Sequence, residues 1–320
     1  MSSRIERWMA TSAEVVVSYS SGKDSTACYL RELERGRPFR AVMWDTGNEH
    51  ELALEYARTL HDKTGGPPVE IYKADFPEER FARRRAWIAE NWPEHGIPQE
   101  VIDRAVRCMV RTGIPFLDLC MLKGRFPSRR AQFCTQELKV IPMESRILIP
   151  EAQRLCELGR TLVSVIGVRA DESRARRAAR AWEWGDWGVV KHRPIVTWTA
   201  ERVFAMHRRH NLAPNPLYSL GCNRVGCMVC VNVSKDELAN AAARWPEHIE
   251  RLREWEIVVA TVSKRGEGTF LPAPDKSVLS GIRSIHQHVE WARTSHGGRQ
   301  FDLETLLPPL ACQSNYGLCE

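Results

Sequence analysis

The stretch from Glu14 to Thr26 constrains the fold more than any other part of the sequence. It opens with the β-branched run Val15-Val-Val-Ser18, which is typical of a strand buried on both faces of a parallel sheet. A short polar turn follows, and the residues from Asp24 to Leu30 favour the start of a helix. A strand, a turn and a helix in this order aim backbone N–H groups, hydroxyls and one ammonium at a common point. That arrangement predicts a phosphate-binding site.

The turn supplies six adjacent candidates for binding the phosphates of a nucleotide: Ser20, Ser21, Gly22, Lys23, Asp24 and Ser25. Gly22 lets the backbone approach a phosphate closely, because it has no side chain. The turn is not a Walker A loop, which requires Gly-x-x-x-x-Gly-Lys-Ser/Thr. The alternative is a solvated Ser/Gly turn in an ordinary α/β sheet. The position between a strand and a helix favours the phosphate site.

Strands and helices alternate after this loop, which indicates a βαβαβ unit. Doubly wound parallel sheets have this pattern, and they bind ligands at the carboxyl ends of their strands. Both the loop and the segment Asp45–Glu49 are expected at such an end. The predicted elements are a helix over 24–35, a strand over 39–44, a helix with Leu52, Tyr56 and Leu60 on one face that ends at Gly65-Gly66, and a strand over 69–72.

The sequence further predicts a nucleotide-binding α/β domain over residues 1–212 and a cysteine-rich region over 213–320. A helical insertion is expected over about 76–150, and a fourth strand over Thr161–Ile166 ends in Gly167 and Arg169. Residues 189–190 and 194–196 are expected to be extended, and Thr199 to cap a helix over 200–210. Further helices are expected to open at the capping box of Ser234 and at Pro246, with surface loops over 261–300.

Composition indicates a globular chain, with 27% charged and 43% hydrophobic residues. No apolar run approaches the roughly 20 residues that a membrane span needs, and the N-terminal residues lack the apolar core of a secretory signal. We therefore expect a cytoplasmic protein without a membrane partner. The net charge of +6 permits a polyanionic partner. Arginine runs at 80–85, 125–130 and 174–180 are equally typical of solvated helix faces.

Ten cysteines in a cytoplasmic chain favour a metal centre or thiol chemistry over disulfides. Cys222, Cys227 and Cys230 are spaced C-x4-C-x2-C in a loop with two glycines, and Cys134 is the candidate fourth ligand. These residues predict an iron–sulfur cluster, with 4Fe-4S as the expected type and zinc as the rival metal. The alternative is that they are small buried apolar residues. We expect that role for Cys28, Cys108, Cys120 and Cys156.

Several of these stretches resemble known motifs. Ser20–Ser25 resembles the Ser-Gly-Gly-Lys-Asp-Ser PP-loop of ATP pyrophosphatases, with Ser21 in place of the first glycine. Four further segments are similar to the phosphoadenosine phosphosulfate reductase family and, with the loop, span about residues 14–231. They are Cys134-Thr-x-x-Leu-Lys-x-x-Pro142, Asn215-Pro-Leu-Tyr218 followed by Gly226-Cys-x-x-Cys230, Asp45-Thr-Gly-x-Glu49 and Gly167-x-Arg169-x-x-Glu-Ser173.

The departures from that family are informative. Sulfonucleotide reductases lack an intact PP-loop and carry a C-terminal Glu-Cys-Gly-Leu-His segment, whereas this chain ends in Tyr316-Gly-Leu-Cys-Glu320. The tandem Cys-Cys of the iron–sulfur reductases is replaced by Phe133-Cys134. An intact loop with cluster-type cysteines resembles the ATP pyrophosphatase of Dnd-type DNA phosphorothioation systems and, more distantly, the iron–sulfur tRNA thiolases.

This resemblance implies an enzyme that cleaves ATP to AMP and pyrophosphate with Mg²⁺ during sulfur incorporation into nucleic acid. A sulfur donor such as a cysteine desulfurase would be a partner. Lys23 and Asp24 would be catalytic, with Lys23 offsetting the phosphate charge. Asp45 would help to hold Mg²⁺ or ribose, Gly167 would belong to the nucleotide pocket, and Arg169 would face the α-phosphate.

Two other functions stay open at this stage. A reductase of adenylylated sulfate would use a mobile thiolate, Cys319 or Cys312, as its nucleophile. A nucleic-acid-binding module would keep the loop only as structure and use the arginine runs and the eleven tryptophans for phosphate contacts and base stacking. The sulfur acceptor, the sulfur donor and the oligomeric state are not determined by the sequence.

Overall fold

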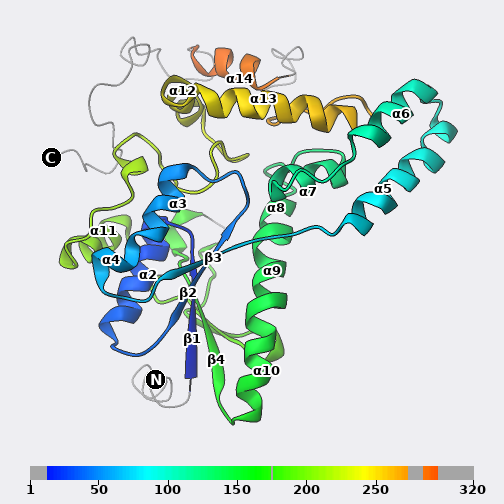
Figure 1. The fold of residues 1–320 in the computed structure, drawn as a ribbon. Coiled ribbons are helices and arrows are strands. Elements are labelled where there is room, and N and C mark those ends of the chain that lie inside the picture. Colours follow the sequence, from blue (N-terminus) through cyan, green and yellow to red (C-terminus); the bar gives the residue numbers. More distant parts are fainter. Residues whose placement is uncertain (1–12, 174–175, 273–283, 295–320) are drawn as a thin grey trace.

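A mixed sheet of six strands organises the chain in the computed structural model, which describes residues 13–173, 176–272 and 284–294 (Figure 1). The strand order is β3-β2-β1-β4-β6-β5, and every pair is parallel except β5 with β6. The doubly wound sheet predicted from the sequence is therefore confirmed. The strands are β1 Ala13–Tyr19, β2 Arg40–Asp45, β3 Val69–Lys73, β4 Thr161–Ile166, β5 Trp182–Trp184 and β6 Val190–His192.

Both faces of the sheet are buried, because successive side chains of a strand point to opposite faces. Val15 and Val17 of β1 pack in one hydrophobic cluster and Val16 in another. Four helices cover the first face of the sheet. Three of them connect strands, and the fourth follows β6: α2 Lys23–Glu34, α3 Glu51–Arg58, α4 Leu60–Thr64 and α11 Ala200–Arg209. In Figure 1, α2, α4 and α11 lie on the left of the strands.

The opposite face is covered by one long helical rod, on the right of the strands in Figure 1. It consists of α8 Phe133–Thr135, α9 Ile141–Met143 and α10 Ile149–Glu157, joined by π-helical turns over Gln136–Val140 and Glu144–Leu148. Each π turn ends two residues before a proline, Pro142 or Pro150. In a regular α-helix a proline ring clashes with the carbonyl four residues earlier. The wider turn relieves that clash and lets the rod continue.

The remaining helices form a second, helical layer: α5 Glu78–Asn91, α6 Gln99–Cys108, α7 Pro115–Lys123, α12 Lys235–Arg244, α13 Pro246–Thr261 and α14 Ile285–Ala292. Their apolar residues share one hydrophobic core, which contains Phe116 from the insertion and Trp255 from the C-terminal region. Residues of the cysteine-rich loop, including Met228 and Val229, belong to the same core. The cysteine loop therefore packs between the helical layer and the sheet. The domain boundary at 212/213 stays a prediction.

Three local expectations were wrong or incomplete. Residues 194–197 form a turn rather than an extended segment, and β5 was not expected. The stretch 261–300 contains α14 in addition to loops. The capping box of Ser234, the cap of Thr199 and the helix start at Pro246 are confirmed. No helix in the described part of the chain is long and apolar enough to cross a membrane.

Candidate functional site

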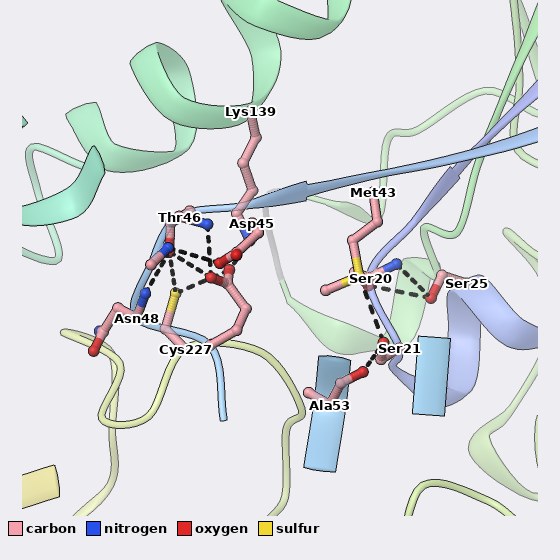
Figure 2. Close-up of polar contacts among 12 residues, drawn as sticks. Ser20, Ser21, Ser25, Met43, Asp45, Thr46, Asn48, Ala53, Lys139 and Cys227 are labelled. Atoms are coloured by element: carbon pink, nitrogen blue, oxygen red, sulfur yellow. Dashed lines mark hydrogen bonds and ion pairs between the residues drawn. The ribbon is translucent and has the colours of Figure 1, made fainter. Parts of the chain in front are cut away.

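The predicted phosphate loop connects β1 to α2 and is tied down by its own hydroxyls. Ser20 Oγ lies 3.1 Å from Ser25 Oγ, and Ser25 Oγ donates to the carbonyl of Gly22 at 3.0 Å. Ser21 has a left-handed backbone with φ of 60°, and its buried Oγ donates to the carbonyl of Ala53 at 2.6 Å. Figure 2 shows this side chain pointing away from the other two serines toward Met43 and Ala53. Ser21 is therefore a buried anchor of the loop.

The start of α2 is not capped by its own N-cap residue. Gly22 is its N-cap residue and no side chain caps the helix, so the first-turn N–H groups lack intrahelical partners. A Cβ added to Gly22 would meet Tyr218 Oη at 3.5 Å and Ser20 Oγ at 3.7 Å, which are ordinary contacts. The fold itself therefore does not require glycine here. This is consistent with a bound group that needs the space, as expected for a phosphate against a helix N-terminus.

Two buried cations flank one carboxylate at this point. Lys23 Nζ lies 3.4 Å from Asp24 Oδ2, and Arg169 Nε donates to Asp24 Oδ1 at 2.6 Å. Lys23 and Arg169 are only 6% and 5% exposed. A Cβ on Gly167 would lie 2.9 Å from the backbone nitrogen of Ser25, so this glycine lets the end of β4 approach the loop. The structure thus brings Lys23, Asp24, Gly167 and Arg169 together as the sequence predicted.

The main chain of Lys23 is held by two side chains from later in the sequence. Its N–H donates to Tyr218 Oη at 2.8 Å, and its carbonyl accepts a hydrogen bond from His207 Nε2 at 3.0 Å. Burial lowers the pKa of His207 to about 4, which leaves the ring neutral near pH 7. Tyr218 lies in a motif noted in the sequence, whereas nothing in the sequence singled out His207 among ten histidines.

A second polar group lies at the end of the neighbouring strand β2, as Figure 2 shows. Asp45 accepts from the N–H of Gly47 at 2.7 Å and pairs with Lys73 at 3.3 Å. Burial raises the pKa of Asp45. The predicted convergence of both segments on the carboxyl edge of the sheet is confirmed by the parallel β1–β2 pairing.

Glu49 is the centre of this second group. Its Oε2 accepts from the N–H and Oγ1 of Thr46, both at 2.7 Å, and its Oε1 accepts from Lys139 Nζ at 3.1 Å. Burial alone would raise the pKa of Glu49, but Lys139 and the hydrogen bonds lower it overall. Cys227 Sγ lies 3.8 Å from Glu49 Oε1 and 3.7 Å from Thr46 Oγ1. Burial raises the pKa of the Cys227 thiol, and the Glu49 charge raises it further.

The cysteine loop is fastened to the segment after β2 by backbone hydrogen bonds. Met228 N donates to the carbonyl of Asn48 at 2.7 Å, and His50 N donates to the carbonyl of Gly226 at 3.2 Å. From α13, Arg251 donates to the carbonyl of Met228 at 3.1 Å. The sheet end and the helical layer therefore hold the loop from both sides.

Cys230 lies close enough to two other predicted thiol ligands, Cys134 and Cys227, to affect the pKa of both. Burial raises the pKa of Cys134, and Cys230 raises it further; Cys230 acts in the same direction on Cys227. Cys222 differs, because burial and then Glu237 of α12 raise its thiol pKa to about 12. Among the described residues no three cysteine sulfurs lie within 4.8 Å of one another. The iron–sulfur cluster, its zinc rival and their ligands stay predictions.

The cysteines that were expected to be small buried apolar residues differ in their burial. Cys28 and Cys120 are buried, as expected, while Cys108 is half-buried. Cys156 is exposed, which contradicts the expectation of a buried apolar role. Its position on the solvent side of α10 explains this, since Ala152 and Leu155 of the same helix face the core. Cys312 and Cys319 lie outside the described residues.

Among the described residues, one group of three potential metal ligands has its donor atoms within 4.8 Å: His50, Glu51 and His248. His248 Nε2 lies 3.1 Å from Glu51 Oε2, and Arg251 Nη2 lies 2.8 Å from Nδ1 of the same ring. The guanidinium and the N-terminus of α3 both add positive charge, which disfavours a cation. We interpret this group as a polar network that ties α13 to α3.

Comparison with known proteins finds several relatives of this chain. The model of the phosphoadenosine phosphosulfate reductase domain matches residues 123–233. A protein of Escherichia phage 186, described as an uncharacterized 37.8 kDa protein in the gpa 5′ region, is 41% identical over 337 residues, which cover 98% of this chain and 99% of that protein. The adenosine 5′-phosphosulfate reductase of Allochromatium vinosum is 34% identical over 89 residues, or 27% of this chain and 34% of the reductase.

A solved structure, the phosphoadenylyl-sulfate reductase of Candida auris in complex with phosphate, is also similar. It is 17% identical to this chain, with a TM-score of 0.41, and the match covers 71% of this chain and 88% of that one.

Proposed function

This chain belongs to the phosphoadenosine phosphosulfate reductase family of PP-loop enzymes, and from that premise we propose that it cleaves ATP to AMP and pyrophosphate to activate a substrate for sulfur incorporation into nucleic acid. ATP is the proposed nucleotide and Mg²⁺ the proposed ion. A cysteine desulfurase-type enzyme is the proposed sulfur donor. Nearness to the Dnd-type phosphorothioation enzymes is part of the proposal.

The observation that carries the proposal is the loop itself. It combines a helix start whose N-cap residue, Gly22, has no capping side chain, room for a Cβ at that glycine, and two buried cations, Lys23 and Arg169, that share Asp24. Arg169 also pairs with Asp171 at 2.6 Å. An ammonium and a guanidinium beside a helix N-terminus are the groups that bind a polyphosphate in proteins. An enzyme whose substrate already carries an activated sulfate has no pyrophosphate to release and needs no such site.

The proposed chemistry divides into two displacements. An oxygen of the substrate attacks the α-phosphorus of ATP, the bond from that phosphorus to the bridging oxygen breaks, and pyrophosphate leaves with the electron pair. A sulfur nucleophile then displaces AMP from the activated substrate. Lys23 and the first turn of α2 would stabilise the charge that develops on the leaving pyrophosphate. Arg169 would face the α-phosphate, Asp24 would position both cations, and Asp45 stays the candidate for Mg²⁺ or ribose.

The cysteine site is consistent with a sulfur-ligated centre in its donor chemistry. Cys134 and Cys227 lie beside Lys139, a cation that stabilises thiolates, and Cys230 lies close enough to affect the pKa of both. A bound iron–sulfur cluster would bind or relay sulfur, or brace the site. Cys222 fits this set less well, since Glu237 is its main charged neighbour.

Lys23→Ala tests the function directly. We expect the substitution to abolish pyrophosphate release from ATP, because it removes the ammonium from the phosphate site. Lys63→Ala is the matched control, since Lys63 is an exposed lysine on α4, and it should release pyrophosphate like the wild type. Unchanged pyrophosphate release from Lys23→Ala would remove the loop from the mechanism.

A sulfonucleotide reductase is the second candidate, favoured by the reductases among the relatives. It would form sulfite from phosphoadenosine phosphosulfate and thioredoxin, with Cys319 or Cys312 as the nucleophile. Sulfite formation without ATP consumption would establish this function in place of ours. A binding module without turnover would show salt-dependent DNA binding and neither reaction.

A further inference from the structure

An edge of the sheet that is remote from the cysteine loop carries the most exposed large apolar side chains in the described part of the chain. Trp184 is 73% exposed and Trp187 is 67% exposed. They lie on the edge strand β5 and on the short turn Asp186–Gly188 that joins it to β6. We call the segment 176–193 the tryptophan edge. Burying two large indole rings normally stabilises a fold, so two rings left in solvent need a different explanation.

The tryptophan edge is held firmly at its base. Trp182 stacks on His192 of β6 with ring centroids 3.6 Å apart and an angle of 8° between the rings. Arg193 donates to the carbonyl of Arg180 at 2.9 Å and to Glu183 at 2.8 Å, and Gly185 N donates to the carbonyl of Val189 at 2.8 Å. Trp187 itself has a left-handed backbone with φ of 61°, a conformation that costs a non-glycine residue about 1 kcal/mol. The exposed rings are therefore presented by an anchored hairpin.

Positive charge gathers on the same segment. Five basic and two acidic residues lie between Arg176 and Arg193, an excess of three, against a net charge of +6 for all 320 residues. Arg177 and Arg180 are exposed. The aliphatic part of the Lys191 side chain lies against Gly185, where an added Cβ would be 3.0 Å from Lys191 Cε. Exposed aromatic rings among cations match the chemistry of a strand with negative phosphates and unstacked bases.

We propose that the tryptophan edge binds single-stranded nucleic acid, with bases stacked on Trp184 and Trp187 and phosphates on the surrounding arginines. A duplex fits less well, since its bases are already stacked on one another. The inference rests on the proposed function, in which nucleic acid is the sulfur acceptor. It adds that this nucleic acid is single-stranded and that the tryptophan edge binds it.

The tryptophan edge also leads toward the nucleotide loop. Trp182 pairs with His192, and His192 pairs with Val165, which is one residue from the end of β4. Beyond that end, Arg169 binds Asp24 of the loop, and Glu172 of the following turn pairs with Arg176. A strand bound along β5 would therefore lie on the side of the sheet that leads, through β6 and β4, to the site where the substrate would be activated.

The test measures binding of a fluorescein-labelled single strand of about 16 nucleotides by anisotropy at low salt, without ATP. Trp184→Ala and Trp187→Gly should each weaken binding about tenfold, the lower range of base–aromatic stacking, and Trp184→Phe should keep most of the affinity. Trp187→Gly also relieves the left-handed backbone, so its thermal stability should not fall. Trp87→Ala is the matched control, a 40% exposed tryptophan on α5, and should bind like the wild type.

The outcomes separate this inference from the proposed function. Lys23→Ala should bind the oligonucleotide normally, so an inactive loop leaves the inference standing. Wild-type affinity in both tryptophan variants overturns it. So does equal competition by a duplex of the same sequence, which would indicate phosphate contacts alone. A wild-type dimer that Trp184→Ala dissociates, with unchanged oligonucleotide binding, would overturn it in favour of an interface between copies of this chain.

Discussion

Gly22 and Gly167 both lie against the nucleotide loop, but the space around them differs. A Cβ on Gly22 would make only ordinary contacts, whereas a Cβ on Gly167 would lie 2.9 Å from Ser25 N and 3.0 Å from Asp24 C and O. The first glycine keeps space that the protein itself does not use. The second is required for backbone to pack on backbone.

This difference gives a paired prediction. Gly22→Ala should unfold at the wild-type temperature but lose nucleotide binding, because its methyl group would lie where a phosphate approaches. Gly167→Ala should lower the free energy of unfolding by about 1–3 kcal/mol through overpacking. Thermal unfolding with and without ATP and Mg²⁺ measures both effects. An ATP-dependent rise in the unfolding temperature of Gly22→Ala would contradict a phosphate at that position.

Ser21 shows what the sequence can reveal at the residue scale. The resemblance places a glycine at this position, and the left-handed φ of 60° explains why glycine suits it. The serine compensates with its buried hydrogen bond to Ala53. Neither the partner nor the burial follows from the sequence, because Ala53 lies on the next helix. The six contiguous residues predicted the loop, but not what anchors it.

At the scale of elements, α11 packs beside α2 and reaches the loop through one histidine. His207 is fully buried, and its Nε2 donates to the carbonyl of Lys23. Its pKa of about 4 lies below the ordinary value because burial disfavours the charged ring. Folding therefore favours the neutral ring, and the unfolded chain binds more protons between these two pKa values.

The pH dependence follows from that sign. The neutral His207 ring contributes fully to the free energy of unfolding above its ordinary pKa of about 6.5. This contribution is lost as pH falls toward 4, and the loss at pH 5 is about 2 kcal/mol. His207→Gln keeps a donor for the Lys23 carbonyl and should unfold with a shallower decrease in stability between pH 7 and pH 5. Urea denaturation at both values measures this. His95→Gln, at an exposed turn, should keep the wild-type slope, and an equally steep slope in His207→Gln would contradict the assignment.

The elements found from the sequence are those with a local signal. Strands β1, β2 and β4 have buried β-branched or apolar runs, and β3 has a short apolar run that is only partly buried. The helices opened by Thr199, Ser234 and Pro246 have local caps or starts. β5 and β6 have three residues each, and their pairing depends on packing between distant segments. α14 lies in a stretch with little periodicity, and it is stabilised where Glu256 of α13 accepts from Ile285 N at 3.0 Å. Such contacts leave no pattern in either segment alone.

At the scale of the whole molecule, the parts of the candidate site that have a local sequence motif were again the predictable ones. Contiguous motifs predicted that the loop and Asp45–Glu49 meet at one edge of the sheet, and parallel strand order explains it. The structure adds Cys227 to this edge, beside Glu49 and Thr46. His207 and Arg251 reach the site from helices far along the chain, so no spacing could identify them. The helical layer that carries Arg251 also determines how the chain divides into folding units.

The hydrophobic cores predict what happens when the chain is cut at the proposed boundary. The two cores on the faces of the sheet end at Leu212 and lie wholly within residues 13–212. The helical core instead combines residues 53–138 with residues 217–292. A fragment of residues 1–212 should therefore keep the sheet but expose the apolar faces of α5, α6 and α7, since their partners in α12 to α14 are absent.

That fragment should bind a hydrophobic dye, lose part of its helical circular dichroism beyond the loss expected from length, and aggregate as concentration rises. Limited proteolysis should cut it first within 76–130, while the same segment in the full chain resists at equal protease concentration. The reason is that the insertion is stabilised by tertiary packing rather than by its own helix propensity. A monomeric fragment with a cooperative unfolding transition and a protected insertion would show instead that residues 1–212 are a self-sufficient domain.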